Sequence, residues 1–155
     1  MKKTNNKGFS LVELIIVVAI MAVLVGVLAP QYIKYLDKSK AGTDRQMLDN
    51  LRQAITTTIL DPDLSDPTDD GAPSIPTTWT SIDDASIGST ADFWEEVFEI
   101  MGVDDGADLI DELAYKVGSG SGADIKFSIN SNKNVGVRII YDGTYGTDKY
   151  DFEIE

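Results

Sequence analysis

An apolar run near the start of the chain passes directly into an amphipathic helical pattern. The run extends from Phe9 to Ala29, and Glu13 is its one charged residue. A helix needs about 20 residues to cross the hydrocarbon of a bilayer, so the run is long enough to span a membrane. From Gln31 the pattern indicates a helix with one apolar face. That face carries Leu48, Leu51, Ile55 and Ile59.

This helix is expected to end near Leu60. Asp61 precedes Pro62, and the residue before a proline is disfavoured in αR geometry. Residues 61–90 are rich in Pro, Asp, Ser and Thr, a composition typical of a long irregular connection. Trp79 and Ile82 are the apolar residues expected to attach this connection to a folded core.

The rest of the chain predicts short helices and then strands. Residues 91–117 carry two helical stripes, of which the second runs from Leu109 to Val117. Residues 125–155 alternate apolar and polar side chains in three stretches. We expect a three-stranded antiparallel meander on the apolar face of residues 45–60. The predicted fold class is α+β: a long N-terminal helical spine packed against a small C-terminal antiparallel sheet, with one or two short helices between.

Charge and composition exclude several functions. The net charge is −13, so the chain offers no basic face for nucleic acid. The chain has no cysteine and no histidine, which removes disulfides, thiolate nucleophiles and the usual neutral-pH base. No nucleophile and base constellation is visible, and an enzyme is not expected. No cofactor is expected; a carboxylate calcium site at Asp142, Asp148 and Asp151 is a weak candidate without an EF-hand spacing.

The acid within the apolar run needs an explanation. A cleaved secretory signal has an apolar region of about 7 to 15 residues, shorter than this run. A plain membrane anchor would leave Glu13 uncompensated, at about 2.5 to 3.5 kcal/mol. Lys2, Lys3 and Lys7 favour a cytoplasmic N-terminus. An intramembrane acid therefore indicates a partner, although an interface-level acid remains the alternative.

The sequence Lys7-Gly8-Phe9-Ser10-Leu11-Val12-Glu13-Leu14 resembles the leader and N-terminus of type IV pilins and the related pseudopilins. The short leader and the Phe after it resemble the type IVa branch and its major pilins. The resemblance implies that prepilin peptidase cuts between Gly8 and Phe9 and that Phe9 becomes N-methylated. It also implies that Glu13 is the assembly glutamate and that Pro30 is the family's helix-kinking proline.

This resemblance divides the chain into four expected parts. Residues 1–8 are a cleaved leader, 9–30 are the membrane and polymerisation half of the long helix, 31–60 are its amphipathic half, and 61–155 form a globular head. The head comprises the connection 61–90, the short helices 91–117 and the strands 125–155.

Residue spacing within the run supports assembly. After cleavage, Glu13 would lie about 6 Å along the helix axis from Phe9, at ~1.5 Å rise per residue. A neighbouring subunit's α-amine at Phe9 could then neutralise the carboxylate and set the register.

Ala22 and Gly26 form a small-xxx-small pair that permits close helix packing, although small residues are common in membrane helices. Pro30 and Gly26 predict a bend or locally unwound turn, with a tolerated kink as the alternative.

The expected function is that of a structural subunit of a type IV pilus, polymerised into a surface filament for adhesion, motility or DNA uptake. The alternatives are a pseudopilin of a type II secretion or competence system and a low-copy minor adhesive pilin. The expected partners are other copies of the chain, prepilin peptidase, the pilus assembly platform and minor pilins. The subunit is expected in the cytoplasmic membrane before assembly, with its N-terminus inside, and in an extracellular filament afterwards.

Two features depart from the pilin pattern. The absence of cysteine removes the disulfide that commonly closes a C-terminal pilin loop, and this absence favours a Gram-positive source. The Asp-Pro-Trp-Gly element of the calcium loop in major type II secretion pseudopilins is also absent.

Overall fold

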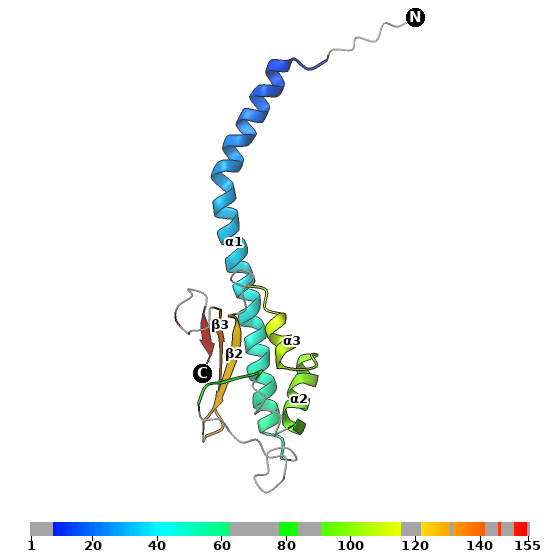
Figure 1. Cartoon of the computed structure of the whole chain (residues 1–155), viewed down its shortest axis with the longest axis vertical. Coiled ribbons are helices and arrows are strands. Elements are labelled where there is room, and N and C mark those ends of the chain that lie inside the picture. Colours follow the sequence, from blue (N-terminus) through cyan, green and yellow to red (C-terminus); the bar gives the residue numbers. More distant parts are fainter. Residues whose placement is uncertain are drawn as a thin grey trace, which may run out of the picture. The chain divides into compact units, whose positions relative to one another are not determined.

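The computed structural model describes residues 8–62, 78–83, 91–115, 122–130, 132–141, 146 and 151–154. The chain divides into two compact units, Met1–Ser39 and Lys40–Glu155, the second of which is called the head unit below. A long N-terminal helix, two short helices and an antiparallel sheet confirm the predicted α+β class (Figure 1). The elements are α1 (Leu11–Ile59), β1 (Thr80–Ser81), α2 (Ala91–Met101), α3 (Gly106–Asp111), β2 (Asp124–Ile129), β3 (Val135–Ile140) and β4 (Phe152–Ile154).

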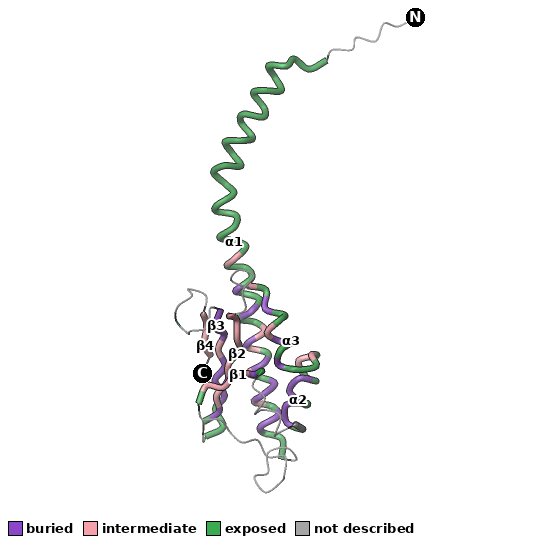
Figure 2. The backbone as a smooth tube through the Cα atoms, viewed as in Figure 1, coloured by how far each residue is buried: buried purple, intermediate pink, exposed green. Residues whose placement is uncertain are grey.

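Within the first unit, α1 has the length and apolar composition of a membrane-spanning helix, and its most apolar stretch buries nothing inside the structure. Figure 2 shows this part of the helix as exposed throughout. The helix continues through Pro30 without a break, so of the two predicted forms, a bend or a locally unwound turn between Gly26 and Pro30, the unwound turn does not occur. Proline removes one N–H donor, and the helical bonds on either side are sufficient to keep the turn helical. A bend at this point stays a prediction.

In the head unit, the C-terminal part of α1 forms the base of the core. The predicted apolar face is confirmed, because Leu48, Leu51, Ile55 and Ile59 are each at most 1% exposed. α2 contributes Trp94, whose ring lies 4.6 Å from the ring of Phe127 on β2. The core therefore joins α1, α2 and the sheet.

α1 ends where the sequence predicts. Its last helical residue is Ile59, one residue before Leu60. The Nζ of Lys133 donates a hydrogen bond to the carbonyl oxygen of Ile59 (3.2 Å). A cation at this position satisfies a terminal carbonyl and interacts favourably with the helix dipole.

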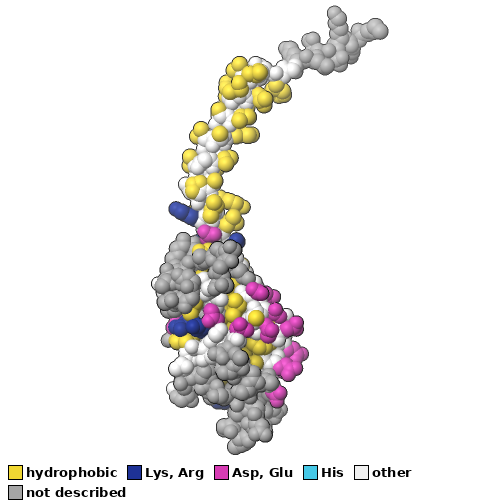
Figure 3. All heavy atoms as spheres, in the orientation of Figure 1, with side chains coloured by type: hydrophobic (Ala, Val, Ile, Leu, Met, Phe, Trp, Pro, Cys, Tyr) yellow, Lys and Arg dark blue, Asp and Glu magenta, His cyan; other side chains and the backbone are white. Residues whose placement is uncertain are grey.

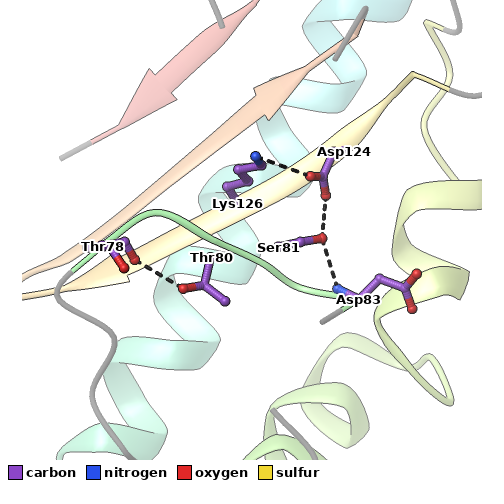
Figure 4. Close-up of polar contacts among 6 residues, drawn as sticks. All are labelled: Thr78, Thr80, Ser81, Asp83, Asp124 and Lys126. Atoms are coloured by element: carbon purple, nitrogen blue, oxygen red, sulfur yellow. Dashed lines mark hydrogen bonds and ion pairs between the residues drawn. The ribbon is translucent and has the colours of Figure 1, made fainter. Parts of the chain in front are cut away.

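The sheet has four strands in the order β1-β2-β3-β4, and each neighbouring pair is antiparallel. The three-stranded prediction is corrected by β1, which pairs Thr80 with Phe127 on β2. Ser81 Oγ donates to Asp124 Oδ1 (2.6 Å) and accepts from the backbone N–H of Asp83 (3.3 Å), as Figure 4 shows. Two residues are too few to show the apolar and polar alternation of a strand. β1 is recognised as a strand only from its pairing with β2.

The connection before α2 is attached to the core as expected. Ile82 is 2% exposed, and its N–H donates to the carbonyl of Ile125 (2.9 Å). The guanidinium of Arg138 lies 4.2 Å from the centre of the Trp79 ring. Both apolar residues singled out in this connection therefore contact the sheet.

The two short helices differ in how well the pattern predicts them. α2 ends at Met101, and Gly102 follows with φ 77°, the left-handed conformation that glycine adopts without strain. α3 is shorter than the stripe that runs to Val117: it ends at Asp111, and Val117 lies outside the described residues. Leu113 is buried although it lies beyond the end of α3. At this position the apolar pattern therefore indicated burial in the core and not helical structure.

Candidate functional site

The start of α1 is a capping box. Leu11 is the first helical residue, so Ser10 occupies the N-cap and Glu13 the third helical position. The Oε2 of Glu13 accepts a hydrogen bond from the backbone N–H of Ser10 (2.8 Å). In a capping box the third-position Glu satisfies the N-cap N–H, which otherwise lacks a helical partner. Glu13 is thus a helix-start residue within its own chain, a role that the Ser10-x-x-Glu13 spacing could have indicated.

The two residues of the predicted cleavage site lie immediately before the helix. Gly8 and Phe9 are both outside regular structure, and the Phe9 side chain is 94% exposed. A Cβ placed on Gly8 would meet no atom within 4 Å. The peptide bond between them is therefore accessible, while residues 1–7 lie outside the described part of the chain.

The small residues of the apolar half have no packing partner within the described chain. Ala22, Gly26 and Pro30 are all exposed, and a Cβ on Gly26 would meet nothing within 4 Å. Nothing in the fold of one copy requires glycine at this position. The large side chains from Leu11 to Leu28 are also exposed, so the whole surface of this helix is available to lipid or to another molecule.

The calcium candidates receive no structural support. Asp142 and Asp148 lie outside the described residues. The carboxylate of Asp151 accepts hydrogen bonds from the backbone N–H of Tyr141 (3.0 Å) and of Gly146 (2.7 Å). Among the residues that the structure describes, no group of three or more acidic side chains could hold a metal ion. The hydrogen bonds of Asp151 therefore link it to Tyr141 and Gly146.

A buried carboxylate that sequence reasoning missed organises the head unit. Asp44 on α1 is 1% exposed and accepts three hydrogen bonds. The donors are the N–H of Ala114 (2.7 Å), the N–H of Tyr115 (2.9 Å) and the hydroxyl of Tyr141 (2.7 Å). These donors belong to the segment after α3 and to the end of β3. Asp44 thus ties three parts of the head together, and no local pattern indicates it.

Comparisons with known proteins concern the N-terminal part of the chain. Residues 3–29 match the prokaryotic N-terminal methylation motif. The chain is 41% identical over 59 residues to the type IV major fimbrial protein FimA of Dichelobacter nodosus, which is 38% of each chain. It is 34% identical over 73 residues to a fimbrial protein of the same organism, covering 47% of this chain and 46% of the relative. No solved structure matches the chain.

These matches confirm the resemblance to type IV pilins at the N-terminus. The matched segment spans less than half the length of these relatives. The expected Gram-positive source has no support, because the relatives come from Dichelobacter, a Gram-negative bacterium. The relatives are fimbrial proteins by name, and this similarity points to a structural protein over an enzyme.

Proposed function

We propose that this chain is a structural subunit of a type IV pilus. In this proposal prepilin peptidase cleaves after Gly8, the new terminus at Phe9 is N-methylated, and the apolar half of α1 polymerises into a surface filament. The methylation motif over residues 3–29 and the similarity to major fimbrial proteins support it.

The observation that carries the proposal is an apolar helix that its own chain leaves uncovered. The large side chains from Leu11 to Leu28 are exposed, although burying an apolar side chain is worth about 1.5–3 kcal/mol. Lipid covers such a surface in a membrane, and other copies of the helix cover it in a filament. Ala22 and Gly26 have small side chains and are exposed, so another helix can approach α1 closely at these positions.

Glu13 supplies specificity to this assembly. Cleavage before Phe9 creates a positive α-amine four residues before Glu13, next to the N-cap of α1. A carboxylate away from water requires a charge partner, and the amine of a neighbouring subunit provides one. Because the Ser10 N–H already orients the carboxylate, little side-chain freedom is lost when the pair forms.

Before assembly the subunit resides in the cytoplasmic membrane. The lysines of the leader keep its N-terminus inside, and the head unit lies on the outer side. The pilus assembly platform then draws it into the filament together with minor pilins. The filament serves adhesion, motility or DNA uptake.

Two related functions compete with a major pilin. A pseudopilin of a type II secretion or competence system would use the same N-terminal devices, and so would a low-copy minor adhesive pilin. The word "major" in the name of the FimA relatives favours the major subunit. The difference is one of copy number and filament length, which the composition of isolated fibres measures.

Replacing Glu13 separates its two roles. Gln at the third helical position of a capping box still accepts from the N-cap N–H, whereas Leu does not. If charge pairing drives assembly, Glu13→Gln and Glu13→Leu both reduce sheared surface fibres at least tenfold, which corresponds to about 1.4 kcal/mol. Immunoblots of the membrane fraction check that each precursor is present and cleaved. Normal fibre yield from Glu13→Gln would show that the charge of Glu13 is not needed.

A further inference from the structure

The head unit carries an open groove. It lies between α1 and α2 and has a volume of about 530 Å³. Ile100 on α2 is 49% exposed beside it, and Leu60 is 63% exposed one turn beyond Thr57 of the lining. These are the two large apolar side chains that the described part of the head unit leaves exposed. The lining residues are Asn50, Gln53, Ala54, Thr57, Ile100 and Met101.

The helix α2, which forms one side of this groove, is acidic. Glu96 precedes Ile100 by one turn of α2, and Glu99 is adjacent to it. Residues 91–115 contain no lysine and no arginine. Figure 3 shows acidic side chains gathered over the surface of the head unit on the side of α2 and α3. The acids in this segment are Asp92, Glu95, Glu96, Glu99, Asp104, Asp105, Asp108, Asp111 and Glu112.

The two arginines in the head part of α1 contact the sheet. The Nε of Arg52 donates to the carbonyl of Val135 on β3 (3.0 Å). The guanidinium of Arg45 lies 4.4 Å from the centre of the Phe152 ring on β4. The groove therefore places the apolar side chains of Ile100 and Met101 beside an acidic helix, and it fits an occupant that is apolar and cationic.

Residues 32–38 of α1 have this chemistry. Tyr32, Ile33 and Tyr35 are 64%, 57% and 71% exposed, and Leu36 is 41% exposed. Lys34 and Lys38 lie one helical turn apart on the same surface, and Asp37 is the one acid. Before assembly, tyrosine and lysine at the end of an apolar span contact lipid headgroups. A subunit that leaves the membrane loses those contacts and needs others.

We propose that the groove of one subunit binds residues 32–38 of a second copy. Residues 32–38 and the groove residues 50–57 follow one another along the same continuous helix, so the occupant comes from another copy. Tyrosine and isoleucine fill the apolar part, and the two lysines meet the acids of α2. This inference rests on the proposed filament and assigns one of its contacts to the head unit.

Cysteine crosslinking in fibres tests the contact directly, because the natural chain has no cysteine. Tyr32→Cys, Tyr35→Cys and Leu36→Cys are each combined with Gln53→Cys or Ile100→Cys. A disulfide needs Cα atoms about 4.4–6.8 Å apart, so it forms between direct neighbours alone. Mild oxidation of fibres gives ladders of linked subunits for at least one combination. The matched control replaces the groove cysteine by Asn132→Cys, an exposed residue between β2 and β3, and gives no ladder.

Charge exchange tests the same contact without cysteine. Lys34→Glu with Lys38→Glu lowers the fibre yield several-fold, and Glu96→Lys with Glu99→Lys does the same. The four changes together return the yield to within twofold of the natural chain. The control combines the lysine changes with Asp83→Lys, an exposed acid beside β1, and gives no recovery.

Failure of this contact differs from failure of the filament. If the natural chain forms no fibres, the proposed function is wrong. If fibres form but no combination gives a ladder and the charge exchange gives no recovery, the groove contact is wrong and the filament stands. Disulfide-linked dimers from the single variant Ile100→Cys would contradict the contact and indicate that α2 of one subunit meets α2 of another, because one cysteine per subunit links two subunits at most.

Discussion

Replacing Asp44 with alanine is expected to loosen the head unit more than any single surface change. The carboxylate accepts hydrogen bonds from Ala114, Tyr115 and Tyr141, at 2.7, 2.9 and 2.7 Å between heavy atoms. Removing it leaves two backbone N–H groups and one hydroxyl without this acceptor. The hydroxyl contact is buried, so water does not readily replace the carboxylate there.

The size of the effect follows from these three bonds. A hydrogen bond to a charged group contributes about 1.5–3 kcal/mol, and bonds that share one acceptor are not additive. We therefore expect Asp44→Ala to lower the free energy of unfolding by about 3–5 kcal/mol. A domain has a total of about 5–15 kcal/mol, so this is a large fraction. Tyr141→Phe removes one donor and costs about 1–2 kcal/mol.

Urea unfolding of the detergent-solubilised protein measures both changes. The fluorescence of Trp94 reports the transition, because this side chain is 5% exposed and packs against Phe93 and Phe127. Glu95→Ala, an exposed acid on α2, is the control and shifts stability by less than about 0.5 kcal/mol. In the double variant of Asp44 and Tyr141 the costs fall short of their sum by about 1 kcal/mol. An Asp44→Ala variant as stable as the control would refute the reasoning.

Three glycines and the side chain of Asn130 give further predictions for the same urea assay. Gly106→Ala is expected to cost about 1–3 kcal/mol, because its Cβ would overlap the carbonyl of Ile82; an unchanged midpoint would contradict the close approach. Gly102→Ala places a side chain at φ 77° and should cost about 1 kcal/mol, whereas Gly42→Ala in the open interior of α1 should stabilise by up to about 1 kcal/mol. Equal effects at these two glycines would contradict the assigned conformations. Asn130→Ala removes an acceptor for the N–H groups of Asn132 and Asn134 and should cost about 1–2 kcal/mol; no loss would show that the turn before β3 does not depend on it.

Local sequence patterns predict the elements that repeat over several turns or residues. The apolar face of α1 at Leu48 and Ile55 and the alternation of β2 at Ile125 and Phe127 are confirmed, because burial of one face imposes a period on the sequence. The end of α1 follows from Pro62, which acts on its immediate neighbour. These parts of the fold need no knowledge of distant contacts.

The differences occur where distant residues decide the local structure. β1 exists because Thr80 pairs with Phe127. The helix α3 does not extend through Ala114 and Tyr115, because the N–H groups of these two residues bind Asp44. An acid on a helical surface does not reveal that its partners lie some 70 residues further along the chain.

The candidate site could be predicted from the sequence because its residues lie close together along the chain. Gly8, Phe9 and Glu13 lie within one short motif, and the structure adds that Glu13 also caps its own helix. The proposed groove between α1 and α2 is not readable in this way. Gln53 and Ile100 meet only in the folded head unit, and the charge asymmetry around them depends on where Arg45 and Arg52 point.

The most direct test of the central claim is the identity of the main protein in sheared surface fibres. Mass spectrometry of that protein from the source organism is expected to give a peptide that begins at Phe9, with a mass increased by one methyl group at its amino terminus. The same spectrum should contain peptides of the head unit in matching amount. Fibres whose main component is another protein, or a chain that still carries residues 1–8, would contradict the account.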